Sequence, residues 1–258
     1  MTGKNIEYKT NQISEYFSMN RITWDQFYPS EKWVLERVAG PDGQMGSVLD
    51  VGCAAGGLGL ALVERFSLTE YVGVDINVQA IRYADTRRHQ YSCPCRFLSG
   101  DVLTIDSLPT DKFDNVFSLS CADWNIETAD IIDKCWQYVR VGGHFILTLR
   151  LTPQRSLLNF SESFQYIYFG KGMPENEKDV EKAPYIVLNV QQALATLANL
   201  QPKPDHIMAY GYWGPPSPTA RTKYDKLVFT ALAVRKGNND EKDITGEFHL
   251  PVDLFLPR

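Results

Sequence analysis

The 258-residue sequence contains no apolar run of about 18 residues, so it predicts no membrane-spanning helix. It has no excess of basic residues either. The net charge of -5 at pH 7 disfavours binding to a phosphate backbone, and therefore a nucleic acid partner. The four histidines and five cysteines match no zinc framework in their spacing, so we expect no metal site.

Two further absences concern location. The first residues lack the apolar stretch of a signal peptide, and the odd number of cysteines favours reduced thiols over a disulfide framework. We therefore expect a cytoplasmic protein with no membrane association. The length fits one domain, or one domain with an insertion, and the sequence gives no signal for an oligomeric state.

Strand-like and helix-like stretches alternate through the middle of the chain. Predicted strands cover residues 47–51, 71–75, 95–98, 113–119 and 144–149. Predicted helices cover residues 58–66, 78–90 and 129–139. This alternation requires parallel strands joined by crossover helices, so it predicts a doubly wound α/β sheet.

The end of the chain follows a different pattern. Strands at 207–213 and 226–234 are joined by a Pro-rich loop with no helix between them, so they must pair as a hairpin. Asn189 is a plausible N-cap for a helix over 190–200, and Ser30 for one ending at Val38. The predicted fold is a Rossmann-like, seven-stranded sheet, mostly parallel, with an antiparallel C-terminal hairpin strand.

We divide the chain into five parts on this basis. They are an N-terminal helical lid (1–46), a cofactor-binding core (47–150), an insertion with an acceptor cap and a helix (151–204), a strand hairpin that completes the core (205–236) and a polar tail (237–258).

The most informative segment is the glycine-rich turn from Asp50 to Gly59. A strand ends there, small residues follow and a helix begins, so a ligand can approach the backbone and the unpaired N–H groups of the helix. Such a turn alone also fits a dinucleotide site, or a tight turn without a ligand. Asp75 and Asp101 follow the next two strands, at the edge where open α/β sheets bind ligands. A carboxylate at Asp75 can accept both hydroxyls of a ribose.

Taken together, these motifs resemble those of the class I S-adenosylmethionine-dependent methyltransferases. The resemblance covers roughly residues 30–150 and 205–235. It implies S-adenosyl-L-methionine as cofactor and a set of cofactor-binding residues: Asp50, Gly52, Cys53, Ala54, Gly56, Asp75, Ile76, Asp101, Val102, Ser120 and Cys121. Ala54 replaces the middle glycine of the family motif.

Asp50 helps to separate two nucleotide-binding interpretations. An acid before the first glycine suits a cofactor that carries an amino group, whereas it would repel the pyrophosphate of a dinucleotide. A methyltransferase is therefore favoured over an NAD-binding oxidoreductase. A silent cofactor-binding scaffold stays an alternative.

The methyl acceptor is harder to read. Asp123 and Arg150 follow strands at the reaction edge, where they are candidates for orienting or holding an acceptor. Arg21 is a further candidate for binding the cofactor, through a carboxylate, and lies in an aromatic N-terminal block that either covers the cofactor or packs on the sheet. Candidate acceptor-binding residues are Trp24, Tyr28, Trp124, Tyr166 and Tyr168. We expect methyl transfer by in-line displacement to an oxygen or nitrogen of a small molecule, such as a sugar or specialised metabolite. RNA or protein methylation is the alternative.

Overall fold

The computed structural model describes residues 16–17, 19–168, 180–238 and 243–256. Its main sheet has nine strands, eight of them in the order β12-β9-β11-β5-β4-β1-β2-β3. The seven predicted strands are all present. They are β1 (Gln44–Val51), β2 (Ser67–Asp75), β3 (Cys95–Ser99), β4 (Phe113–Ser118), β5 (Val139–Thr152), β9 (Pro204–Gly214) and β11 (Leu227–Lys236).

The direction of the strands also follows the prediction. The first five pair in parallel, and β11 pairs antiparallel with both β5 and β9. The succession of strands across the sheet changes direction at β1, which has β2 on one side and β4 on the other. This change creates the switch point where such sheets bind ligands. The doubly wound α/β fold is therefore confirmed.

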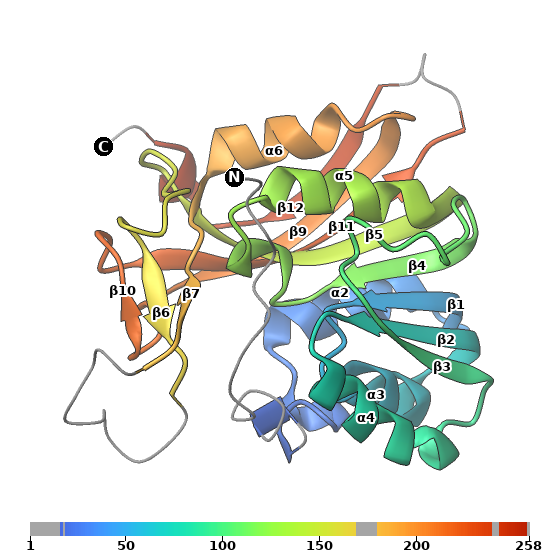
Figure 1. Ribbon diagram of the computed structural model, residues 1–258. Coiled ribbons are helices and arrows are strands. Elements are labelled where there is room, and N and C mark those ends of the chain that lie inside the picture. Colours follow the sequence, from blue (N-terminus) through green and yellow to red (C-terminus); the bar gives the residue numbers. More distant parts are fainter. Residues whose placement is uncertain (1–15, 18, 169–179, 239–242, 257–258) are drawn as a thin grey trace.

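Helices cover both faces of this sheet (Figure 1). On one face lie α5 (Thr128–Tyr138) and α6 (Val190–Ala198), and on the other lie α2 (Pro29–Ala39), α3 (Gly57–Arg65) and α4 (Val78–Thr86). Each face has its own apolar core. Trp136 of α5 and Leu197 of α6 belong to one cluster, and Leu35 of α2 and Leu62 of α3 to the other. The sheet is thus buried on both sides, which positions its carboxyl edge rigidly.

The caps of two helices test the local predictions. Asn189 caps α6 as predicted, because its side-chain oxygen accepts hydrogen bonds from the amides of Gln191 and Gln192. Ser30 does not cap α2. That helix begins two residues earlier than predicted, at Pro29, with Tyr28 as its N-cap residue, and the Glu31 carboxylate accepts from the Tyr28 amide at 2.9 Å. Proline suits the first helical position, where its missing N–H costs nothing.

The structure corrects the prediction of a polar tail over residues 237–258. Residues Thr245–His249 form β12, which pairs in parallel with β9 at one edge of the sheet. A short 3-10 helix, Val252–Phe255, then buries Leu254 completely. The strand contains only one large apolar residue, Phe248, because an edge strand exposed to solvent needs no alternating pattern. A two-residue strand, β8 (Leu188–Asn189), pairs with β5 and brings the sheet to nine strands instead of seven.

The insertion after β5 builds a second, three-stranded sheet. It consists of β6 (Phe164–Tyr166), β7 (Lys182–Pro184) and β10 (Ala220–Arg221), in the order β10-β6-β7. Figure 1 shows this small sheet beside the end of the main sheet from which β5 leads into the insertion. Short 3-10 helices complete the chain at Trp24–Gln26, Arg88–Gln90 and Ala122–Trp124. Among the described residues, no helix combines the length and apolar character needed to cross a membrane.

Candidate functional site

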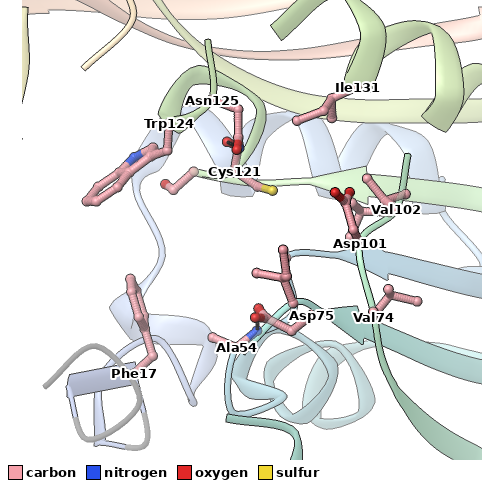
Figure 2. Close-up of a pocket in the computed structure, with 15 residues that line it drawn as sticks. Phe17, Ala54, Val74, Asp75, Asp101, Val102, Cys121, Trp124, Asn125 and Ile131 are labelled. Carbon is pink, nitrogen blue, oxygen red and sulfur yellow. Dashed lines mark hydrogen bonds between the residues drawn. The ribbon is translucent and has the colours of Figure 1, made fainter. Parts of the chain in front are cut away.

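A first cavity lies at the carboxyl ends of β1, β2 and β4 and beside the loop after β3. Its volume is about 100 Å³, and Figure 2 shows Phe17 and Trp124 across it from Asp101 and Val102. Eight of the predicted cofactor-binding residues line it: Gly52, Ala54, Asp75, Ile76, Asp101, Val102, Ser120 and Cys121. Four segments separated in sequence, at the ends of β1, β2, β3 and β4, thus meet where the sheet topology places a ligand. We call this the cofactor cavity.

Asp75 is fixed in the cofactor cavity by two backbone amides. One carboxylate oxygen accepts from the Ala54 amide and the other from the Asn77 amide, both at 2.8 Å. An ionised carboxylate offers about four acceptor sites, so capacity for ligand hydroxyls is left. Burial raises the pKa of Asp75, and the two amides act in the opposite direction.

Asp101 lies in the loop after β3. Its Oδ1 accepts from the Leu103 amide at 2.9 Å. The neighbouring Val102 is buried and Asp101 is half-buried, so the pair presents an apolar and an acidic surface side by side. Such a surface suits a heteroaromatic ring that carries an amine donor.

The glycine-rich turn has the left-handed backbone that its composition predicts. Gly52, Ala54 and Gly56 have φ values of 76°, 46° and 76°. Gly56 does not face the cofactor cavity, however. A Cβ there would lie 2.8 Å from the hydroxyl of Tyr91 and 3.0 Å from the ring of Phe97. Its role is to let α3 begin against those rings.

Asp50 lies at the end of β1, in a recess of about 70 Å³ that shares Gly52, Ala54 and Ser120 with the cofactor cavity. The Tyr71 hydroxyl donates a 2.5 Å hydrogen bond to its carboxylate. Burial raises the pKa of Asp50 to about 7, while the hydrogen bond from Tyr71 lowers it. Cys53 lines the same recess. Burial raises its thiol pKa, as it raises that of Cys121 to about 12, so both thiols stay protonated.

A second cavity of about 470 Å³ adjoins the first and is large enough for a small organic molecule. The two cavities share Phe17, Ser120 and Trp124 in their walls. Its other walls come from the N-terminal segment, β5, β6 and the loop after β9. We call it the acceptor cavity. Of the predicted residues it contains Arg21, Tyr28, Asp123, Trp124 and Arg150.

Asp123 and Arg150 form a buried ion pair in the wall of the acceptor cavity. The Arg150 Nε lies 3.3 Å from Asp123 Oδ2, and the two side chains are 6% and 5% exposed. Arg150 Nη1 also donates to the carbonyl oxygens of Asp123 and Ile186, and the guanidinium lies 3.7 Å from the centre of the Tyr185 ring. Burial raises the pKa of Asp123, and Arg150 counteracts this effect.

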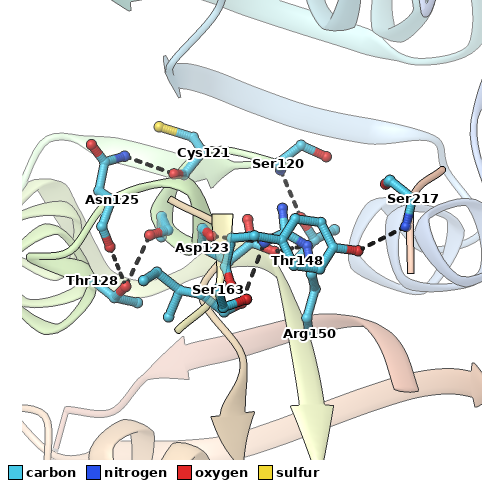
Figure 3. A network of polar contacts seen from close by, with 12 residues as sticks. Ser120, Cys121, Asp123, Asn125, Thr128, Thr148, Arg150, Ser163 and Ser217 are labelled. Atoms are coloured by element: carbon cyan, nitrogen blue, oxygen red, sulfur yellow. Dashed lines mark hydrogen bonds and ion pairs between the residues drawn. The ribbon is translucent and has the colours of Figure 1, made fainter. Parts of the chain in front are cut away.

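Ser120 stands at the boundary of the two cavities. Its φ of 52° is in the left-handed region, which is unusual for serine. Its amide donates a 2.6 Å hydrogen bond to the Thr148 hydroxyl of β5. Figure 3 shows this contact among the polar groups that surround Asp123 and Arg150. This hydrogen bond, from the loop after β4 to β5, therefore fixes one of the residues that both cavities share.

Three predicted acceptor-binding residues line neither cavity. Trp24 packs edge-on against Phe66, with ring centres 5.3 Å apart. Tyr166 stands on β6 next to Gln165, and only Gln165 faces the acceptor cavity, because successive strand residues point to opposite faces. Tyr168 follows β6 and is likewise outside the described walls.

Sequence reasoning missed most of the far wall of the acceptor cavity. That wall consists of Tyr212, Gly214, Pro215, Pro216, Ser217, Pro218, Phe229 and Thr230. The Pro-rich loop had been assigned only a connecting role, although its position between two strands of the sheet was a usable signal. Sequence reasoning also missed Glu31, whose carboxylate Oε1 lies 2.7 Å from Arg21 Nη2.

Comparison with known proteins places the core in a family. A family profile described as a methyltransferase domain matches residues 48–143. The malonyl-acyl-carrier-protein O-methyltransferase of Paenibacillus sp. (strain JDR-2) is 24% identical over 144 residues, which are 55% of this chain and 51% of that protein. Phosphoethanolamine N-methyltransferase 1 of Arabidopsis thaliana is 31% identical over 162 residues, which are 61% of this chain and 32% of that protein. The chain thus spans about half or less of the length of these relatives.

A solved structure extends the likeness of fold. Phosphoethanolamine N-methyltransferase 2 of Haemonchus contortus, in complex with S-adenosyl-L-methionine, superposes with a TM-score of 0.55 and 15% identity. The match covers 88% of this chain and 56% of that one. Residues 48–143 therefore match a methyltransferase domain, and the chain shares its fold with a methyltransferase structure that was solved in complex with S-adenosyl-L-methionine.

Proposed function

We propose that the chain is an S-adenosylmethionine-dependent methyltransferase that transfers a methyl group to an oxygen or nitrogen of a small-molecule acceptor. The observation that carries this proposal is the junction at Ser120. There, a carboxylate-lined cavity at the switch point of the sheet adjoins a larger cavity of about 470 Å³. A transferase for two substrates needs two sites that share one boundary.

The residues of the cofactor cavity fit the cofactor group by group. Asp75 can accept the ribose hydroxyls, Asp101 an amine of adenine, and Ile76 and Val102 can pack on the base. Asp50, in the adjoining recess, suits the amino group of the methionine part. When bound, the cofactor supplies a methyl group already activated by a sulfonium.

The protein then has to align the acceptor and keep water out. Alignment alone can supply a large part of the rate of an in-line displacement. Ser120 and Trp124 border both cavities and are suited to hold the acceptor against the methyl group. Asp123 is the one carboxylate of the acceptor cavity placed beside them, and it can receive a proton from a hydroxyl or amine.

The size of the acceptor cavity supports a small acceptor over a macromolecule. Its walls come from six parts of the chain, including the N-terminal segment and the Pro-rich loop, and they surround a volume of ordinary ligand size. The relatives named above carry the names of an O- and an N-methyltransferase, so they support the reaction class and leave the acceptor open.

Calorimetric titration separates the alternatives. The purified chain should bind S-adenosylhomocysteine and should not bind NAD. Binding of NAD alone would mean an oxidoreductase, and the proposal would be wrong. A chain that binds S-adenosylhomocysteine but transfers no label from methyl-labelled S-adenosylmethionine to any acceptor in a cell extract would be a silent scaffold.

A further inference from the structure

The charged side chains in the wall of the acceptor cavity balance one another. Arg21 pairs with Glu31, and Arg150 pairs with Asp123. Among the described residues that line the cavity, these four are the only ones whose side chains carry a full charge at neutral pH. The wall therefore offers no net charge to a ligand.

The two cations are also committed to contacts within the protein. Arg150 donates to two carbonyl oxygens as well as pairing with Asp123, and its guanidinium is stacked on Tyr185. Arg21 lies 4.8 Å from the centre of the Phe27 ring, and its Nη2 donates to Glu31 at 2.7 Å. A phosphate or carboxylate on the ligand would have to break one of these pairs, which is costly for buried charges.

Two polar atoms of residues in the same wall have no hydrogen-bond partner among the described residues. Asp123 Oδ1 accepts nothing from another residue, and Gln165 Oε1 is likewise unpartnered. These residues are only 3% and 6% exposed. Buried polar atoms are normally paired, so the two together point to a ligand that completes them.

The kind of ligand follows from the kind of atom. The carboxylate and carboxamide oxygens are acceptors, so the ligand must donate hydrogen bonds. The Asp123 charge is compensated by Arg150, so no unbalanced anion is left to attract an ammonium group. The rest of the wall includes the aromatic side chains of Trp124, Tyr212 and Phe229 as well as uncharged serine and threonine residues.

We propose, on the basis of the proposed function, that the methyl acceptor is a neutral ring with at least two hydroxyl groups and is methylated on oxygen. One hydroxyl donates to Asp123 Oδ1 and a second to Gln165 Oε1. In the transfer, that first hydroxyl oxygen forms a bond to the methyl carbon, the bond from this carbon to sulfur breaks, and its electron pair stays on the sulfur. The hydroxyl proton passes to the Asp123 carboxylate and then to solvent.

Matched acceptors that differ in charge test whether the site prefers a neutral ring. The neutral 4-methylcatechol is compared with the cationic dopamine and the anionic protocatechuate, which carry the same two hydroxyls. Methyl α-D-glucoside is compared with glucose 6-phosphate, and this arm distinguishes a sugar ring from a phenol. We expect a kcat/KM at least tenfold higher for a neutral member than for its charged counterparts.

A binding measurement tests the residues without turnover. In the presence of S-adenosylhomocysteine, Gln165→Met should weaken binding of the preferred neutral ring at least tenfold, measured by calorimetry. Affinity for S-adenosylhomocysteine should stay within twofold. Gln137→Met, the same change on an exposed face of α5, is the control and should alter neither affinity.

The outcomes separate this inference from the proposed function. If S-adenosylhomocysteine does not bind, both are wrong. If it binds, but the charged rings are preferred or neither neutral ring binds, the neutral hydroxylated acceptor is excluded while the methyltransferase assignment stands. Loss of ring binding in Gln165→Met, with cofactor affinity retained, is the result that we expect.

Discussion

The two cavities differ in how completely their polar groups are paired. In the cofactor cavity, both oxygens of Asp75 already accept backbone hydrogen bonds, and no described lining residue has a buried polar side-chain atom without a partner. In the acceptor cavity, two buried polar atoms, Asp123 Oδ1 and Gln165 Oε1, lack partners. The first site is therefore organised by the fold itself, whereas the second depends on its ligand to satisfy it.

The largest effect is expected on the acceptor side. Arg150→Met leaves Asp123 buried without its counter-charge, which should reduce the free energy of unfolding by about 3–5 kcal/mol. Urea denaturation measures the change. Arg155→Met is the matched control, because its pair with Glu162 is exposed and its loss should matter much less. Equal effects of the two substitutions would mean that the buried pair has no special role.

A smaller effect is expected on the cofactor side. Asp75→Ala should weaken S-adenosylhomocysteine binding by roughly 1–3 kcal/mol, the scale of hydrogen bonds to a charged group. Calorimetry measures it directly. Asp85→Ala, on the exposed face of α4, removes a carboxylate of the same type far from the cavity and should have no effect. Unchanged affinity in Asp75→Ala would remove the ribose assignment.

The same contrast explains what could be predicted from the sequence. The cofactor side is built from strand ends of a local β-α-β pattern, so Asp75 and Asp101 could be placed from their positions alone. The acceptor side is assembled by long-range contacts. The sequence pointed to Tyr166 and missed its neighbour Gln165. A shift of one residue along a strand moves the side chain to the opposite face of the sheet, so this error exchanged the residue that lines the cavity for one that does not.

Other details depended on tertiary packing that the sequence does not display. Gly56 was assigned to the ligand, yet the rings of Tyr91 and Phe97 occupy the space beside it. The strand β12 has no recognisable pattern because it only adds to an edge that β9 already provides. Pairings of this kind become visible only when the partner element is in place.

The pH dependence of cofactor binding should report on Asp50, whose pKa is raised to about 7. Ionisation of Asp50 strengthens its attraction for the amino group of S-adenosylhomocysteine, so affinity should rise up to roughly tenfold from pH 6 to 8. The folded protein holds a proton on Asp50 that the unfolded chain releases near pH 4, so this group makes stability fall as pH rises from about 4 to 7. Asp50→Asn should flatten the binding profile. A profile that stays steep would assign the titration to another group.

The smallest effect concerns the backbone of the turn. Ala54 has a φ of 46°, where a Cβ is strained and glycine is not. Ala54→Gly should relieve this strain but raise the entropy of the unfolded chain, for a net stabilisation of at most about 1 kcal/mol. Thermal unfolding measures it. A clear destabilisation would show that the Ala54 methyl group contributes packing beyond this balance.

The most direct test of the two adjoining cavities is a crystal structure with S-adenosylhomocysteine. We expect the ribose on Asp75, the adenine beside Val102, and the sulfur at Ser120, facing the acceptor cavity. A ligand bound elsewhere, or one whose sulfur points away from the acceptor cavity, would contradict this arrangement.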